Sequence, residues 1–332
     1  SPPPAYAESA FWFFQMVFVA TAASVVSGCL AERMRLWPFL LFVAGLTGII
    51  YPMIGGWTWG GGWLAELGFA DFAGSTIVHS VGGWAALSGA IILGPRTGRF
   101  LERGASAAFP HASAPQVAIG VFILWFGWFG FNGGSLLSFS SVEDALTVST
   151  IFVNTNAAAG GGLLTALIVT QLIRGKPDLL MTLNGALAGL VAITAEPTAP
   201  SVGLSLLIGA GGSLVMLGAA KLLVRLRIDD VVGAIPVHLA AGIFGTLVVP
   251  LTNDGASFGD QALGVAAIGA FTFGASMVVW MVLRSVVGLR LKAQDETIGA
   301  DQSELGTPAY HLPVWSPSGP SVSPVLEKEL VT

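Results

Sequence analysis

Long apolar stretches recur along this chain and constrain its fold more than any other feature. A stretch of about 20 apolar residues crosses the ~30 Å hydrocarbon core of a bilayer as one helix. Charged residues are only 10% of the 332 positions and apolar residues are 54%, a balance that excludes a water-soluble domain. The sequence predicts an all-α, polytopic membrane helix bundle of about nine transmembrane helices. We expect them over 8–29, 37–55, 71–94, 116–137, 147–173, 179–195, 201–224, 231–250 and 261–287.

The distribution of basic residues predicts the orientation of these helices. All 14 Lys and Arg residues fall in or beside alternate connections or the C-terminal tail, and the intervening connections carry acidic and tryptophan side chains instead. The positive-inside rule therefore places the first residues outside and the tail in the cytoplasm. The apolar pattern stops before the tail, so we expect a transmembrane domain over 1–292 and a cytosolic, partly disordered tail over 293–332.

Small residues and cysteine usage narrow the class further. The 44 glycines suit a packed polytopic bundle, because small residues let transmembrane helices approach closely. Cys29 is the single cysteine, which excludes an internal disulfide framework and a thiolate metal cluster. We expect neither a cofactor nor redox chemistry.

Two segments in opposite halves share one spacing, in which an Asp is followed by a His eight residues later and by a Gly four residues after that. Helix 71–94 enters from outside and helix 231–250 enters from the cytoplasm, so the two copies run in opposite senses, as inverted repeats in transport proteins do. At about 1.5 Å per residue, each histidine lies ~12 Å from its own face and hence near the midplane. The spacing is shared by Asp71, His79 and Gly83 and by Asp230, His238 and Gly242.

A lone membrane histidine often serves only an interhelical hydrogen bond, but two at symmetric depth favour a pathway, because ionisable groups inside membranes usually face one. The remaining histidines, His111 and His311, lie in a cytosolic connection and the tail, so we predict no metal site. Asp230 lies at a helix start, where we expect it to cap backbone N–H groups. For Asp71, capping and attraction of cations at an outer entrance stay open as alternatives.

Aromatic side chains gather at the predicted outer ends of several helices. Phe14 and Phe18 are four residues apart, on one face of the first helix. Trp59 follows the second helix, and the fourth helix leaves the membrane through the Trp-, Phe- and Gly-rich stretch 125–135. A small cation losing its water here could be held by ring faces and a hydroxyl, each ring contributing on the order of 1 kcal/mol.

Several longer motifs follow one another along the chain: Ala31-Glu32-Arg33, Trp59-Gly60-Gly61-Gly62, Asp71-Phe72-Ala73-Gly74-Ser75-Thr76, Val78-His79, Gly127-Trp128-Phe129-Gly130-Phe131-Asn132, Asp229-Asp230 and Val237-His238. Through these motifs, and over nearly its whole length, the chain resembles the ammonium transporter family, the Amt, Mep and Rh proteins. Family members usually have eleven helices, arranged as two inverted five-helix repeats and a final helix, and form homotrimers with one pore per subunit. The first two helices have no counterpart here, so we expect two more upstream of Ser1.

The resemblance implies an outer site that recruits ammonium through cation-π contacts and a hydroxyl, a pair of stacked rings that closes the pore below, and two pore histidines. Asp71 matches the aspartate that supports the recruitment site. The recruitment site matches Phe14, Trp59 and Ser135. The stacked rings match Phe18 and Phe131, and the histidines match His79 and His238. Further pore-lining positions match Trp128 and Thr194.

The implied function is transport of ammonium or ammonia across the cell's inner (cytoplasmic) membrane, with ammonium deprotonated before it crosses and potassium rejected because it has no proton to lose. The tail resembles the family segment that binds the P-II nitrogen-regulatory protein in bacterial relatives. We expect the lipid bilayer, ammonium and a homotrimer as partners, P-II as a further one, and no nucleic acid.

Two other functions are alternatives to transport. An ammonium sensor would use the same outer site and signal through the tail; no kinase or cyclase domain follows residue 292, which makes this the second reading. An intramembrane enzyme would need a nucleophile beside Asp71, His79 and His238, and the sequence offers none at a usable spacing. The sequence therefore predicts a transporter and no enzyme.

Overall fold

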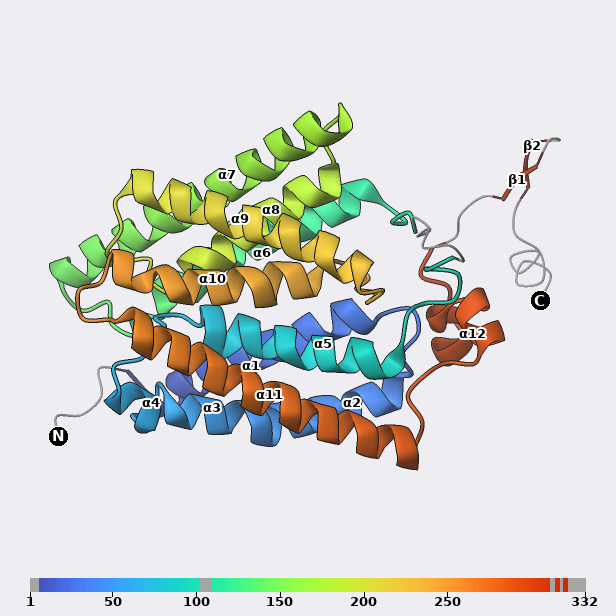
Figure 1. Ribbon diagram of the computed structural model, residues 1–332, viewed down its shortest axis with the longest axis horizontal. Coiled ribbons are helices and arrows are strands. Elements are labelled where there is room, and N and C mark those ends of the chain that lie inside the picture. The colour runs from blue at the N-terminus through green and yellow to red at the C-terminus, as the bar shows by residue number, and fades with distance from the viewer. Residues whose placement is uncertain (1–5, 102–108, 311–313, 317–318, 322–332) are drawn as a thin grey trace.

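The computed structural model describes residues 6–101, 109–310, 314–316 and 319–321, and its helices run side by side along one axis (Figure 1). Within these residues, seven helical segments are long and apolar enough to cross a membrane. They are α1 (Glu8–Leu30), α2 (Leu36–Gly45) continued by η1 (Leu46–Ile50) and α3 (Tyr51–Trp57), η2 (Ser75–Ser80) continued by α5 (Val81–Leu93), α6 (Ala114–Gly134), α7 (Val142–Arg174), α9 (Val202–Arg225) and α11 (Phe258–Val286).

Two shorter apolar helical segments correspond to the remaining two predicted transmembrane helices. They are α8 (Leu179–Ile193) and the run of η4 (Ile235–Ala240), α10 (Ala241–Val248) and η5 (Val249–Leu251). The remaining elements are short: α4 (Trp63–Glu66), α12 (Ala293–Ile298), η6 (Asp301–Leu305), β1 (Val314–Ser316) and β2 (Gly319–Ser321). β1 and β2 pair antiparallel. The predicted all-α membrane bundle is confirmed, and each predicted helix is present.

Helix α7 begins at Val142, five residues before the predicted start, because a capping box precedes it. The Asp144 N–H donates to Ser141 Oγ at 3.0 Å, and the Ser141 N–H donates to the Asp144 carboxylate at 3.1 Å. The apolar pattern missed this turn because the charged residues Glu143 and Asp144 interrupt it.

The two histidine-bearing helices lie side by side in the middle of the bundle, where η2 and α5 cross η4 and α10 (Figure 1). The repeat glycines lie at the crossing. A Cβ on Gly83 would lie 2.5 Å from the Cβ of Leu239, and one on Gly242 would lie 2.3 Å from the Ser75 carbonyl oxygen. Only a residue without a side chain lets the backbones approach this closely, which explains the glycine in the repeated spacing.

Both histidine helices begin inside the helix bundle, and the repeat aspartates cap their N-terminal ends. The predicted starts at 71 and 231 are too early, because the chain is not yet helical there. The Asp71 carboxylate accepts hydrogen bonds from the N–H groups of Gly74, Ser75, Thr76 and Ile77, at 2.8–3.1 Å. The Asp230 carboxylate accepts those of Gly233, Ala234 and Ile235, at 2.7–3.1 Å. The predicted capping by Asp230 is confirmed, and Asp71 caps in the same way.

At the opposite end of the bundle from the Asp71 cap, ionic contacts join the two halves. The Arg96 guanidinium donates to both oxygens of the Asp229 carboxylate, at 2.8 and 3.1 Å. Arg33 is fully buried and donates to the Gly94 and Asp229 carbonyl oxygens. Burial would raise the pKa of the Asp229 carboxyl, but the hydrogen bonds and charge of Arg96 outweigh it and lower that pKa below its usual value.

We predict that Gly242→Ala destabilises the protein by about 1–3 kcal/mol, because the new methyl group forces apart two packed backbones. The midpoint of thermal unfolding in detergent measures the change. Gly218→Ala in α9 is the matched control, since a Cβ at Gly218 meets nothing within 4 Å. Equal unfolding midpoints for the two variants would contradict the role assigned to the crossing.

Candidate functional site

Aromatic rings from three elements meet at the end of the bundle where α1 begins. The Phe18 ring stacks on the Phe131 ring, with centroids 4.1 Å apart and an angle of 22° between planes. Phe14 lies 4.5 Å from Phe18, and the Trp59 ring meets Phe18 edge-on at 5.8 Å. Phe18 is 1% exposed. The rings predicted to form the outer site and the pore closure are therefore brought together.

Trp59 is held in place by the backbone of the first cap. Its indole N–H donates to the Asp71 carbonyl oxygen at 2.9 Å. The Asp71 side chain is buried, and both of its carboxylate oxygens accept backbone N–H groups. Asp71 thus supports Trp59 through its main chain and caps a helix through its side chain. Attraction of cations by Asp71 stays a prediction.

Ser135 is the C-cap residue of α6. Its hydroxyl donates to the Phe131 carbonyl oxygen at 2.8 Å, one helical turn below. Since the hydroxyl proton is used in this bond, the oxygen lone pairs remain as acceptors. A cation above the rings could be contacted by these lone pairs. Phe14 lies close to the same turn, because a Cβ on Gly134 would lie 2.9 Å from its ring.

The two histidines contact each other directly. The Nδ1 atoms of His79 and His238 are 3.2 Å apart, and the ring centroids are 5.2 Å apart. Such a contact needs one donor and one acceptor, so both rings can be neutral only as opposite tautomers. His79 is 1% exposed, and its Nε2 has no hydrogen-bond partner among the described residues.

The histidines continue the row of rings that starts with Phe18. The His79 ring lies 5.3 Å from the Phe131 ring and 5.0 Å from the Trp128 ring, nearly parallel to both. The Trp128 indole N–H donates to the Thr194 hydroxyl at 2.8 Å, which fixes the ring beside His79. Phe18, Phe131, His79 and His238 thus form a row of adjacent rings, and Trp128 with Thr194 lies beside this row.

Asn132 and Thr155 were not predicted as part of this arrangement. The buried Asn132 amide donates to the Thr155 hydroxyl at 2.9 Å, and its oxygen accepts from the Thr194 hydroxyl at 3.2 Å. These bonds tie α6 to α7 and α8 behind Trp128. The sequence signal for this contact was a polar residue, Asn132, directly after Phe131 in an apolar helix. Its partners are distant in sequence, and only the fold brings them together.

Comparisons with known proteins identify the family. A sequence model of the ammonium transporter family matches residues 2–310. The chain belongs to this family. The chain is similar to the ammonium transporter Amt2 of Archaeoglobus fulgidus, at 39% identity over 90% of this chain and 69% of that protein. It is also similar to the putative ammonium transporter sll1017 of Synechocystis, at 43% identity over 89% of this chain and 67% of that protein. The chain thus spans about two thirds of these relatives.

Solved structures of family members share the fold. The chain superimposes on a protein named Sensor Amt Protein with a TM-score of 0.85 and 38% identity, covering 91% of this chain and 78% of that one. It superimposes on Mep2 of Candida albicans with a TM-score of 0.76 and 28% identity, covering 93% and 73%. The predicted family and its multi-pass membrane fold are confirmed. The relatives are named as transporters, a class distinct from enzymes.

We predict that Asp71→Asn lowers the free energy of unfolding by about 1–3 kcal/mol, because the NH₂ that replaces one carboxylate oxygen cannot accept from the two N–H groups bound to that oxygen. Unfolding in detergent measures the loss. Asp254→Asn, an exposed acid in a connection, is the control and should stay within about 0.5 kcal/mol of the unsubstituted protein. An unchanged stability for Asp71→Asn would mean that the cap contributes little.

Proposed function

We propose that this chain conducts ammonium equivalents across the inner (cytoplasmic) membrane along the row of rings. The observation that carries the proposal is the continuous alignment of the Phe18, Phe131, His79 and His238 rings, with centroid separations of 4.1, 5.3 and 5.2 Å. Membrane histidines usually face a pathway. Here they directly follow an aromatic closure.

Recruitment takes place above the closure. Phe14 and Trp59 offer ring faces, and Ser135 offers hydroxyl lone pairs. Each cation-π contact contributes about 0.5–2 kcal/mol, more as water is lost. Asp71 supports this site by holding Trp59 through its carbonyl oxygen. Ammonium fits such a site because it is a small cation whose four N–H groups can donate to the hydroxyl while its charge faces the rings.

Deprotonation follows from the electrostatic barrier at the closure. Moving a bare cation into a medium of low dielectric costs tens of kcal/mol in the idealised limit, whereas neutral ammonia avoids most of this cost. The Phe18 and Phe131 rings offer no hydrogen bond to replace lost water. Ammonium therefore gives its proton to water at the outer site before it passes them as ammonia, and the hydrogen-bonded pair of His79 and His238 relays a proton inward. Potassium, which has no proton, is rejected.

The histidine pair serves the neutral species below the closure. One Nδ1 is bonded to the other, so each ring keeps its Nε2 available, one as donor and one as acceptor. Ammonia can donate and accept, and it therefore matches both. The partnerless Nε2 of His79 supports this role, since a buried polar atom without a partner is costly unless a ligand or water satisfies it. Trp128 and Thr194 line the same stretch.

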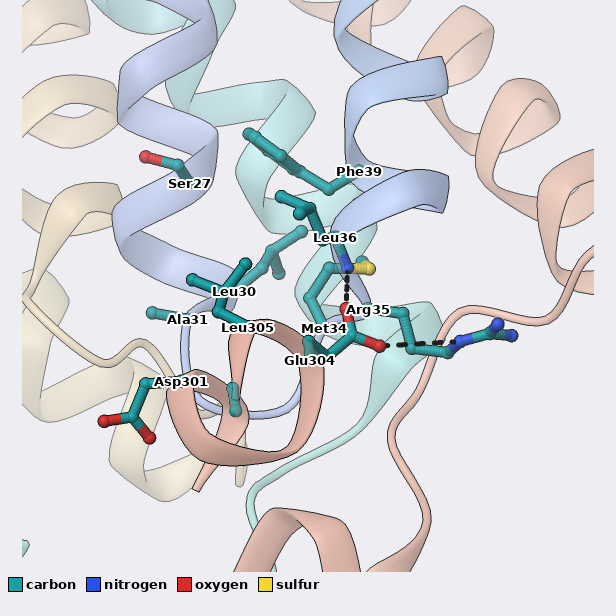
Figure 2. A pocket seen from close by; sticks show the side chains of 11 residues that line it. Ser27, Leu30, Ala31, Met34, Arg35, Leu36, Phe39, Asp301, Glu304 and Leu305 are labelled. Carbon is teal, nitrogen blue, oxygen red and sulfur yellow. Dashed lines mark hydrogen bonds and ion pairs between the residues drawn. The ribbon is translucent and has the colours of Figure 1, made fainter. Parts of the chain in front are cut away.

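The tail is the regulatory part of this proposal, and residues 1–292 form the transport domain. Figure 2 shows Glu304 of η6 against the start of α2, with its carboxylate accepting the Leu36 N–H and lying 4.0 Å from Arg35. A largely apolar cavity of about 280 Å³ lies between η6, α1 and α2. Earlier in the tail, Glu296 pairs with Arg290 at 2.8 Å.

These contacts hold the tail at one end of the bundle. We assign this end to the cytoplasm because the basic connections gather there. The position suits a site at which the P-II protein acts on a homotrimer. Sensing through the same tail is the second candidate function, favoured by the similarity to the Sensor Amt Protein. Of the expected disorder in 293–332, the parts over 311–313, 317–318 and 322–332 lie outside the described residues, whereas α12 and η6 are helical.

We predict that purified protein in liposomes gives an ammonium-specific current on a solid-supported membrane, and that His79→Ala combined with His238→Ala abolishes it or admits potassium. The physical reason is that alanines leave room for water and remove the hydrogen bonds offered to ammonia. A pH-sensitive dye inside the vesicles follows ammonia entry in parallel. The absence of both signals in the unsubstituted protein would refute transport.

We predict that removal of residues 293–332 changes the maximal ammonium flux and leaves ammonium selectivity over potassium intact, because the tail contacts α2 and lies apart from the row of rings. The same liposome assay measures both quantities. Arg174→Gln, which breaks a surface ion pair with Asp178, is the control and should change neither. Loss of selectivity on truncation would show that the tail shapes the pore itself.

A further inference from the structure

Gln261 of α11 is fully buried and makes three hydrogen bonds to main-chain atoms of two other elements. Its amide NH₂ group donates to the Ala70 carbonyl oxygen at 2.6 Å and to the Thr246 carbonyl oxygen at 2.9 Å. Its carbonyl oxygen accepts the Ala70 N–H at 2.8 Å. The side chain thus satisfies both polar groups of Ala70, as a neighbouring strand would.

Ala70 directly precedes the residue on which the outer site depends. The Asp71 carbonyl oxygen receives the indole N–H of Trp59, and the Asp71 carboxylate caps the helix that carries His79. On the other side of Ala70, the Phe69 ring lies so close to α11 that a Cβ on Gly264 would fall 2.1 Å from it. The segment that positions Trp59 is therefore fastened to α11 by a hydrogen-bonded amide and a packed ring.

The second half of the chain treats the equivalent position differently. Asp229 precedes the Asp230 cap as Ala70 precedes Asp71, and it is held by ionic bonds from Arg96. The residue before each cap is thus clamped, by a neutral amide in the first half and by an arginine in the second. A neutral clamp adds no positive charge near rings that would bind a cation, whereas an arginine there would repel ammonium.

We propose that Gln261 is a positioning residue for the outer cation site, which fixes the orientation of Trp59 through Ala70 and Asp71. This inference rests on the proposed function of that site. Gln261 acts through the main chain and touches no substrate. Its loss frees the segment 69–71 to shift, and a Trp59 ring that is no longer held at the outer site binds the cation more weakly.

The test is the concentration dependence of ammonium flux in liposomes for Gln261→Met, which keeps the side-chain length and removes all three hydrogen bonds. We expect KM to rise about tenfold and maximal flux per folded protein to stay within about twofold, because only binding at the outer site is weakened. Thr272→Val on the same helix is the matched control, as its buried hydroxyl has no partner among the described residues. A fall in maximal flux at unchanged KM would indicate a merely structural role and overturn the proposal.

Gln261→Glu supplies a second, independent signature and carries the test where the methionine variant does not fold. A protonated carboxyl can accept from the Ala70 N–H and donate to its carbonyl oxygen, whereas a carboxylate only accepts. The ratio of its KM to that of the unsubstituted protein at the same pH should be near one in acid and rise with pH. A ratio that does not change with pH would contradict the proposed clamp.

A double variant shows whether the effect passes through Trp59. Gln261→Met should raise KM in the unsubstituted protein and have little effect in Trp59→Leu, because the side chain that it positions is then absent. Additive effects would overturn the inference. If the unsubstituted protein transports ammonium but Gln261→Met leaves KM unchanged, only this inference fails. If the unsubstituted protein shows no ammonium response, it is the proposed function that fails.

Discussion

The close crossing of the two histidine helices is the contact on which the rest of the structure depends. Their backbones approach within a distance that excludes a Cβ at Gly83 and Gly242. Lipid offers no hydrophobic force to bring helices together, so such packing relies on small residues and shape. Because the crossing lies close to His79 and His238, it also sets the 3.2 Å separation of their Nδ1 atoms. A wider crossing would separate the rings and end the row.

The crossing imposes a second requirement, since helices that start inside the bundle leave N–H groups that water cannot reach. Each such group costs several kcal/mol if left unpaired. The repeat aspartates meet this requirement in both halves. Each cap must in turn be held in place, by Gln261 through Ala70 at one end and by Arg96 through Asp229 at the other. The outer site uses this framework, because Trp59 bonds to the main chain of a cap.

The sequence was sufficient for features that repeat or depend on local pattern. Apolar length predicted the helices, and one repeated spacing drew attention to both histidines and to both aspartates. Capping was predicted for Asp230 and left open as one of two alternatives for Asp71. It was insufficient where polar partners are distant along the chain. The bonds of Gln261 to Ala70 span 191 residues, and nothing near either residue indicates the other. The early start of α7 was missed for a different reason, because capping residues are polar and the apolar pattern begins after them.

The contacts of the tail provide a physical route from the tail to the helices that carry the histidines. Arg290 pairs with Glu296 and also donates to the Leu93 carbonyl oxygen at 3.2 Å, at the last residue of α5. The same helix carries Gly83, where it meets the second histidine helix. A displacement of the tail that alters the Arg290 contact therefore acts on one of two helices that cannot move independently at their crossing. A ligand of the tail can use this route only to the extent that it binds one arrangement of these helices more tightly than another. In transport the output is ammonium flux past the histidines, and in sensing the output is a change at the tail. The same residues would serve both functions.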